Sequence, residues 1–389
     1  LAKTFQHISS GMLINFGTKF SRQTPPASFQ MVRLLQKWTQ TMREANTSRA
    51  LREICTMPVR TSGGPTSTGT IRTTSLAHPI PVGLDNLSNP PKRLRVLVIL
   101  VGQPRGGELA YRSMEKFLLA PHNADLATFF TETAPVTYLQ KIARYNWVVP
   151  EYDDWFSVLD TVAATCVGER NVQNLRNRLW GPGQGGSKFM GHKSLTVAHA
   201  KSSVTLMAFR WLVHQKLVQL RLYEEYDMFV FSRADEAYIC DHIPISELYQ
   251  ECSNCAWCTE GEEYGGFSDR HWVAPANVFR QVMNMTTHVL CNSDRFFGMV
   301  QNLESLIKVA FMDLKIAVKQ FPPSFFTIQR QMDRINFPSW AAPQDAPSDA
   351  ASFGLVLKYP SEYNRAKQRC GLNMTIAFNA LENVNVTAP

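Results

Sequence analysis

Ionisable residues gather in two short stretches of this chain that could carry chemistry. In the first, Arg233 and Asp235 follow the apolar run Met228 to Phe231, which is typical of a buried strand. The second is G-E-E-Y-G-G-F-S-D-R-H, residues 261–271, with three carboxylates, an arginine and a histidine in one loop. Charges at the carboxyl end of a buried strand face the ligand crevice of open α/β sheets. The alternatives are pairing with a neighbouring helix and solvated local ion pairs, which contribute little to stability. Two such stretches together favour a functional site.

A glycine-rich loop follows an earlier predicted strand. Residues 94–101, L-R-V-L-V-I-L-V, are apolar enough for a central strand that is buried on both faces. The loop G-Q-P-R-G-G at 102–107 comes next, and a helix is expected over 108–119. In this arrangement backbone N–H groups and a helix N-terminus can meet a phosphate or a nucleotide. The loop is neither G-x-G-x-x-G nor a Walker loop, so its spacing alone does not identify a ligand.

Strands and helices alternate through the middle of the chain, which predicts an α/β fold with a mostly parallel sheet flanked by helices. The strands expected besides those above cover 124–131 and 325–328, and the helices cover 201–222, 303–318 and 360–368.

Composition changes divide the chain into three parts. Residues 1–92 are predicted to be a stem or linker, largely irregular, with one amphipathic helix at 30–52. Residues 93–335 are predicted to form the catalytic domain, which contains a second glycine-rich loop at 181–186. Residues 336–389 are expected to form a linker and a C-terminal extension.

The overall composition is that of a globular protein. With 389 residues, 44% of them hydrophobic, the chain can bury one large core or two moderate ones. A net charge of +8 favours anionic partners, but the basic residues form no nucleic-acid motif, so we expect no nucleic-acid partner. No run approaches the roughly 18 apolar residues of a membrane helix. Membrane attachment is therefore expected only through an anchor preceding Leu1.

Cysteines and sequons bear on the compartment. Cys252, Cys255 and Cys258 form C-x-x-C-x-x-C, with Cys240 upstream. A structural zinc site, a local disulfide and free thiols are all compatible with this spacing. Five N-x-[ST] sequons, which would be usable in a secretory lumen, occur at Asn46, Asn86, Asn284, Asn373 and Asn385.

Four segments taken together resemble glycosyltransferases with the GT-A fold. They are V-L-V-I-L-V-G-Q-P-R-G-G, N-A-D-L-A-T-F-F, Y-E-E-Y-D-M-F-V-F-S-R-A-D and G-E-E-Y-G-G-F-S-D-R-H, and the likeness covers about residues 94–330. It is closest to poorly characterised microbial and algal transferases with a strand, an R-x-D and a downstream G-E-D-Y-G-G-x-x-D-R-H. The resemblance implies a Rossmann-like sheet, a nucleotide-sugar donor, and a glycan or other glycoconjugate hydroxyl as acceptor.

The resemblance also assigns residues to the donor side. Gly102, Gln103 and Arg105 would hold the base and ribose. Asp235 matches the last Asp of the usual D-x-D, which binds a divalent metal, Mn²⁺ or Mg²⁺, on the diphosphate. Arg233 stands where an Asp is common, and its guanidinium can bind the diphosphate directly.

The acceptor side and the compartment follow in the same way. Asp269 matches the general base of inverting members, with Glu263 nearby. Arg270 is assigned to the nucleotide sugar, and His271 to the metal shell or the phosphate. The implied location is the Golgi lumen, as a truncated type II membrane protein, with the cytoplasm as the alternative. A nucleotidyltransferase and a catalytically inactive sugar- or nucleotide-binding module, which includes a zinc-stabilised docking surface, are the competing functions.

Overall fold

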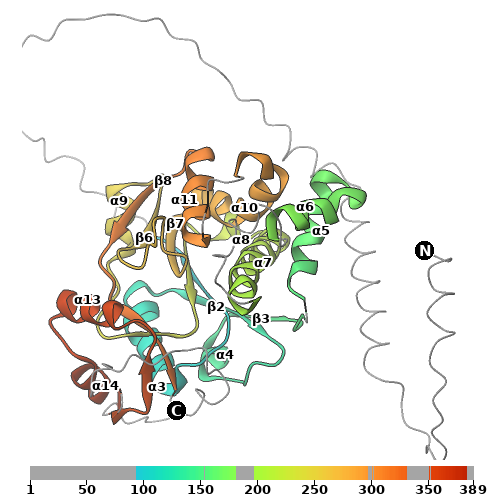
Figure 1. Cartoon of the computed structure of the whole chain (residues 1–389). Helices are drawn as coiled ribbons and strands as arrows, with labels where there is room; N and C mark the ends of the chain where they lie inside the picture. The colour runs from blue at the N-terminus through green and yellow to red at the C-terminus, as the bar shows by residue number, and fades with distance from the viewer. Residues whose placement is uncertain are drawn as a thin grey trace, which may run out of the picture. The chain divides into compact units, whose positions relative to one another are not determined.

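The apolar runs of the sequence form the centre of a seven-stranded sheet in the computed structural model of the protein (Figure 1). The structure describes residues 93–152, 154–180, 197–296, 300, 302–330, 350 and 352–382, except for the side chains of 177–180, 197–202 and 382. All of them belong to one compact unit, Leu87–Pro389. The second unit, Leu1–Asn86, lies outside the described residues, as do the whole predicted stem at 1–92 with its helix and the loop at 181–186.

The strands of the large sheet are arranged in the order β3-β2-β1-β4-β7-β6-β8. Six of them run in one direction, and β7 is antiparallel to both of its neighbours, β4 and β6. The predicted α/β fold with a mostly parallel sheet is thus confirmed. The strands are β1 (Val96–Val101), β2 (Asp125–Thr131), β3 (Tyr145–Val149), β4 (Met228–Arg233), β6 (Cys255–Thr259), β7 (His271–Pro275) and β8 (Ala317–Phe321).

Helices cover both faces of this sheet, which is why β1 and β4 carry apolar side chains on both sides. One face packs against α5 (Phe156–Val167), α6 (Val172–Trp180), α7 (Val197–Gln219), α8 (Leu222–Glu225), α10 (Ala276–Cys291) and α11 (Leu303–Asp313). The other face packs against α3 (Gly107–Met114), the π-helical turn Glu115–Leu119, α4 (Tyr138–Ile142) and α9 (Ile245–Glu251). In the described part of the chain, no helix is long and apolar enough to cross a membrane.

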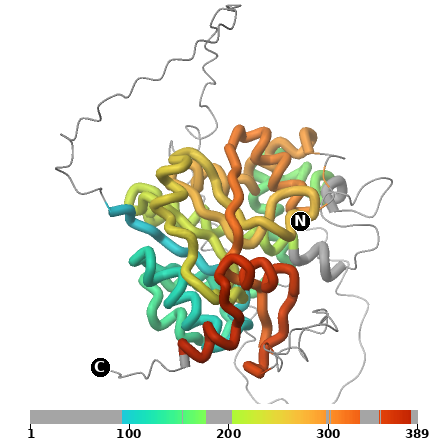
Figure 2. The backbone as a smooth tube through the Cα atoms, turned by 90° about the vertical axis from the view of Figure 1, so that its left-hand side faces the viewer, coloured from blue at the N-terminus to red at the C-terminus, as the bar shows by residue number. Residues whose placement is uncertain are grey.

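The C-terminal segment folds back onto the second face of the sheet (Figure 2). Its strand β10 (Leu355–Leu357) joins a small antiparallel sheet with β9 (Phe325–Arg330) and β5 (Glu236–Tyr238). The helices α13 (Pro360–Cys370) and α14 (Met374–Glu382) complete the same hydrophobic core. The residues next to β10 therefore come close to the end of β4.

One predicted helix ends early. The apolar pattern at 303–318 predicts a single helix, but α11 stops at Asp313 and residues from Ala317 form β8. Lys315 adopts a left-handed conformation (φ 57°), which ends the helix. Of the last apolar positions in this pattern, Ile316 therefore lies just before β8, and Val318 lies in β8 and pairs with β6.

Three disulfides cross-link the described residues: Cys166–Cys291, Cys240–Cys370 and Cys252–Cys255. Cys258 is a buried free thiol. The structure therefore forms the local disulfide that the C-x-x-C spacing allowed, and it leaves no zinc site of these four cysteines. Disulfides of this kind are typical of proteins that fold in an oxidising compartment.

The Cys240–Cys370 disulfide ties the end of α13 to the loop after β5 across a sequence separation of 130 residues. Replacing both cysteines by serine is expected to lower the free energy of unfolding by about 2–5 kcal/mol, because the open chain regains loop entropy. Urea unfolding measures the change, and hydrogen exchange should show α13 opening first. The matched control is the serine pair at Cys166 and Cys291, which should leave α13 protected; equal loosening of α13 in both variants would contradict this role.

Candidate functional site

The carboxyl ends of β1 and β4, where polar residues follow each apolar run, lie side by side. Val101 is the register partner of Arg233, and the Ala234 N–H donates to the Val101 carbonyl at 2.9 Å. Directly after β1, Gly102 has a φ of 94°, a conformation that favours glycine and turns the chain over the sheet edge. Beyond it, Arg105 donates from Nε and Nη2 to Gln103 Oε1, at 3.2 and 3.0 Å.

Arg233 and Asp235 form a two-bonded ion pair at this edge. Arg233 Nε donates to Asp235 Oδ1 at 2.8 Å, and Nη2 donates to Oδ2 at 2.6 Å. Burial by itself raises the pKa of Asp235, but the Arg233 guanidinium outweighs it, helped by Arg105 and Lys358, and the pKa is lowered overall. The Arg233 side chain keeps 16% of its surface exposed against 5% for Asp235. Asp235 therefore orients a charged guanidinium whose remaining edge can face a ligand.

The second predicted stretch reaches the same edge, because β7 starts where β4 ends. Arg270 donates from Nη1 to Glu362 Oε1, and its Nε lies 3.8 Å from Asp269 Oδ1. The Arg270 guanidinium carbon lies 4.0 Å from the centre of the Tyr359 ring, in a cation–π arrangement. Glu362 is held in turn by the Thr327 N–H at 2.8 Å. Asp269 and Arg270 thus meet residues of the C-terminal segment.

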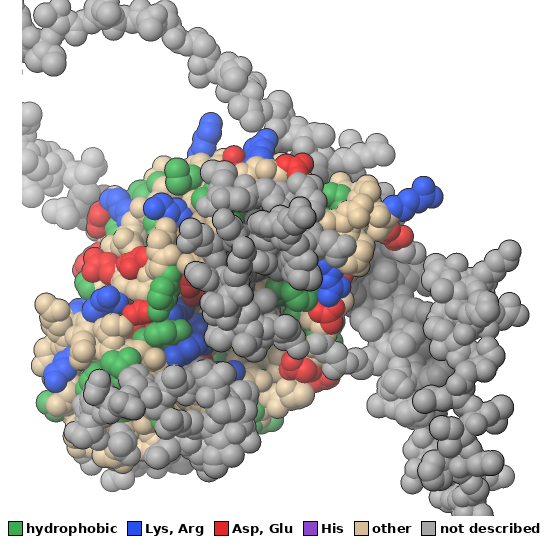
Figure 3. Space-filling view, viewed as in Figure 1, with side chains coloured by type: hydrophobic (Ala, Val, Ile, Leu, Met, Phe, Trp, Pro, Cys, Tyr) green, Lys and Arg blue, Asp and Glu red, His purple; other side chains and the backbone are tan. Residues whose placement is uncertain are grey.

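Lys358 is a third cation in this cluster. Its pKa is lowered to about 8, first by burial and then by repulsion from Arg233, with Arg270 adding to the effect and Asp235 opposing it. Lysine and arginine side chains appear in blue on this face at the level of α13 (Figure 3). We define the cation cluster as Arg233, Arg270 and Lys358. A lysine whose charged form is disfavoured by neighbouring cations marks a place that an anion would stabilise.

Sequence reasoning missed Lys358, Tyr359 and Glu362. They lie at or just before the start of the predicted helix at 360–368, where charged residues are typical of a solvated helix face, and only the pairing of β10 with β9 brings them to the site. The one local signal is the short apolar run Leu355–Leu357 directly before them.

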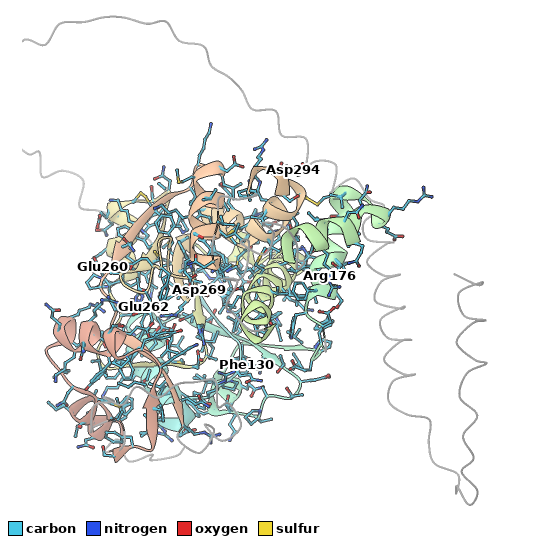
Figure 4. All side chains as sticks on the ribbon, viewed as in Figure 1. Phe130, Arg176, Glu260, Glu262, Asp269 and Asp294 are labelled. Atoms are coloured by element: carbon cyan, nitrogen blue, oxygen red, sulfur yellow. A yellow bond between two sulfur atoms is a disulfide. The ribbon has the colours of Figure 1, made fainter. Side chains whose placement is uncertain are left out.

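The structure does not bring Glu263 into this group. Its Oε1 accepts from the Gly261 N–H and from Gln320 Nε2, the latter at 3.2 Å, so the carboxylate faces β8. Glu262 lies between Asp269 and the edge of the molecule in Figure 4, and it accepts from the hydroxyls of Ser361 and Tyr264.

His271 belongs to a buried polar chain beneath the site. Its Nδ1 lies 2.8 Å from Ser232 Oγ, and its Nε2 lies 3.1 Å from His242 Nε2. Ser232 Oγ also lies 2.5 Å from Glu236 Oε2, and His242 Nδ1 lies 2.7 Å from the Ile243 carbonyl oxygen. Burial lowers the pKa of His271 to about 3, lowers that of His242 well below its usual value, and raises that of Glu236.

When all four side chains are neutral, their hydrogen bonds can all form only if each donates in the order from Glu236 to His242. Protonated Glu236 donates to Ser232, which donates to His271 Nδ1, and His271 Nε2 then donates to His242. If Glu236 were ionised, the single hydroxyl proton of Ser232 would point to it. His271 would then have to donate from both ring nitrogens and carry a buried charge, which its lowered pKa opposes.

The predicted metal ligands do not fit a divalent metal. Both carboxylate oxygens of Asp235 accept from Arg233, and both ring nitrogens of His271 are occupied by Ser232 and His242. Within the described residues, no three acidic, histidine or cysteine side chains are placed to share a metal ion.

Acid is expected to destabilise the protein through its buried histidines. The pKa values of His271 (to about 3) and His214 (to about 4) are lowered mainly by burial, so the unfolded chain binds protons below pH 6.5 that the folded chain does not. The free energy of unfolding should fall between pH 6.5 and 4, by up to about 1.4 kcal/mol per pH unit for each such histidine. Urea unfolding across this range measures it. His271→Gln should reduce the slope, and an unchanged slope would contradict the buried neutral state.

A separate hollow lies at the ends of α5 and α10. It is lined by Asn171, Asn174, Asn292, Asp294 and Arg295 among others and has a volume of about 520 Å³. Figure 4 places Asp294 well apart from Asp269. The hollow is mostly polar and holds none of the predicted site residues, so we place the chemistry at the sheet edge.

Comparisons with known proteins add a likeness of fold only. No family model and no curated protein sequence matches the chain. Among solved structures, the chain is similar to mouse xyloside xylosyltransferase 1 in its apo form, with a TM-score of 0.33 and 12% identity over 59% of this chain and 85% of that one. A likeness of this size assigns neither a family nor an activity. What the chain shows directly is an α/β fold with a mostly parallel seven-stranded sheet and a polar cluster at the carboxyl edge of its central strands.

Proposed function

We propose that the protein is a glycosyltransferase that moves a sugar from a nucleoside-diphosphate donor to a hydroxyl of a glycan or glycoconjugate. One observation carries the proposal. The cation cluster of Arg233, Arg270 and Lys358 assembles at the carboxyl edge of β1 and β4, with Asp269 beside it. The motif resemblance of the sequence to GT-A glycosyltransferases supports the same reading.

The donor diphosphate would lie against this cluster. When the bond between the sugar and the diphosphate breaks, negative charge builds on the departing phosphate oxygens. Arg233, held in place by Asp235, presents a guanidinium edge to that charge, and Lys358 and Arg270 add to the field. Gln103 and Arg105 lie on the adjoining loop, where the nucleoside would lie.

Asp269 is the proposed general base. It lies at the inner end of the loop 261–271, next to Arg270 and only 7% exposed. A base must reach the acceptor hydroxyl while it excludes bulk water, and a carboxylate at the rim of the cation cluster meets that requirement. The disulfides support an oxidising compartment, and we propose the Golgi lumen as the site of action.

A transfer assay tests the function. The protein is incubated with a panel of nucleotide sugars and mixed glycan acceptors, and release of nucleoside diphosphate is measured together with a new glycoside product. One donor giving both signals supports the proposal. Binding without either product across the panel would favour a non-catalytic binding module. Incorporation of a nucleotide, with release of pyrophosphate, would indicate a nucleotidyltransferase.

Lys358→Met is expected to change the affinity for a nucleoside diphosphate and the stability of the fold in opposite directions. Removing a cation that burial and Arg233 disfavour is expected to raise the free energy of unfolding by about 1 kcal/mol at pH 7, and this gain should disappear as the pH rises from about 8 to 10.5. Affinity for a nucleoside diphosphate should nevertheless fall about 10- to 100-fold. Calorimetry and urea unfolding give the two values, with the exposed Lys367→Met as the control. Unchanged affinity would remove Lys358 from the site.

A further inference from the structure

A second carboxylate, Glu304, lies beside Asp269. Glu304 stands in the first turn of α11, a helix capped by Asn302, whose side chain accepts from the Ser305 N–H at 2.8 Å. The backbone carbonyl oxygen of Glu304 accepts from the Phe267 N–H at 3.1 Å. The loop that carries Asp269 is therefore bonded directly to the turn that carries Glu304.

Gly266 makes this approach close. A Cβ built on Gly266 would lie 1.9 Å from the carbonyl carbon and oxygen of Glu304, so only glycine fits there. A second link comes from Asn302, whose Nδ2 donates to the Tyr264 carbonyl at 2.9 Å. Backbone contacts thus hold the first turn of α11, with Glu304, against the loop that carries Asp269.

Beneath them lies a fully buried arginine. Arg210 of α7 is 0% exposed and donates from Nη2 to the Asp269 carbonyl oxygen at 3.1 Å. Its Nε and Nη1 have no hydrogen-bond partner among the described residues. A buried guanidinium with unused donors is costly unless negative charge lies within reach, and the carboxylates that attract it are those of Asp269 and Glu304.

We propose that Glu304 acts with Asp269 as a carboxylate pair that takes the proton of the acceptor hydroxyl. The inference rests on the proposed function. In the step, the hydroxyl proton moves to the pair while the acceptor oxygen bonds to the anomeric carbon of the sugar. The bond from that carbon to the donor phosphate breaks, and its electrons leave with the nucleoside diphosphate. Arg210 stabilises the charge of the pair before the proton arrives.

The electrostatics of Glu304 agree with this role. Burial raises the pKa of Glu304 to about 7, and the charge of Asp269 raises it further, while Arg270 and Arg210 oppose the shift. A base works best when its pKa is near the working pH. Asp269 and Arg270 on the loop 261–271 and Arg210 on α7 thus set the charge around Glu304.

The test compares Glu304→Gln with the parent protein in the transfer assay. We expect kcat to fall at least 100-fold with the donor KM unchanged, and the acid limb of the pH profile, near pH 7 in the parent, to move by at least one unit. Glu247→Gln, at an exposed position of α9, is the control and should behave as the parent. An undiminished kcat with the same acid limb would overturn the role of Glu304 while leaving the transferase proposal intact.

Thermal unfolding gives a readout that does not need activity. A raised carboxyl pKa favours the folded state below pH 4.5, and this contribution is lost as the pH rises through about 7. The melting temperature of the parent should therefore drop relative to Glu304→Gln between pH 5 and 8. In Asp269→Asn the drop should shift to lower pH. A drop at the same pH in the parent and in Asp269→Asn would show that the two carboxylates are not coupled, and a difference that does not vary with pH would show that the Glu304 pKa is not raised, whether or not the protein transfers sugar.

Discussion

Replacing Asp269 by asparagine is expected to lower sugar-transfer turnover by about two to four orders of magnitude while leaving donor-nucleotide affinity nearly unchanged. The amide cannot accept the acceptor proton, but it keeps the shape of the side chain, and the Arg210 bond goes to the backbone carbonyl, which the substitution retains. Single-turnover rates and nucleotide titrations measure the two quantities. The anomeric configuration of the product should be determined alongside, because an acceptor-side carboxylate has another role in a retaining enzyme. Equal loss of donor binding and turnover would place Asp269 in the nucleotide site.

The second large effect is expected at the Arg233–Asp235 pair. The double variant Arg233→Gln and Asp235→Asn should weaken nucleoside-diphosphate binding at least 100-fold, because the oriented guanidinium is lost. Removing both charges together avoids leaving one buried charge unpaired, which alone would cost about 3–5 kcal/mol of stability. Calorimetry measures the affinity.

One single variant completes this test. Asp235→Asn leaves Arg233 charged but without its partner, so both stability and affinity should fall. This differs from a carboxylate that only serves a ligand, whose removal leaves the fold intact. Parent-like affinity in the double variant would show that Arg233 does not contact the diphosphate.

The middle of the large sheet, β2, β1 and β4, was predictable because these three strands are marked by local sequence, whereas β3, β6, β7 and β8 were not predicted. Residues of β1 and β4 are apolar at consecutive positions, and only strands buried on both faces need that pattern. Polar residues at their ends then had to meet, because adjacent parallel strands share one edge. The end of α11 was not predictable in this way, since the left-handed Lys315 interrupts a run whose apolar spacing continues.

The site was predictable only where its residues cluster in sequence. Asp269 and Arg270 stand out through local ionisable density, whereas Lys358 and Glu304 are single charges in ordinary helical or tail sequence. Their roles depend on long-range contacts, such as the pairing of β10 with β9 and the bond from Phe267 to Glu304. His271 shows the converse. Its position suggested a phosphate or metal ligand, but its partner His242 lies 29 residues away and the two rings meet only in the folded core.

The most direct test of the central claim is a thermal-shift panel of nucleoside diphosphates and nucleotide sugars, run with the parent protein in EDTA and in Mn²⁺. If the cation cluster binds the diphosphate, at least one nucleotide raises the melting temperature in EDTA, and this rise disappears in the Arg233→Gln and Asp235→Asn double variant. No shift with any nucleotide under either condition, or an equal shift in the double variant, would contradict a donor site at the edge of β1 and β4.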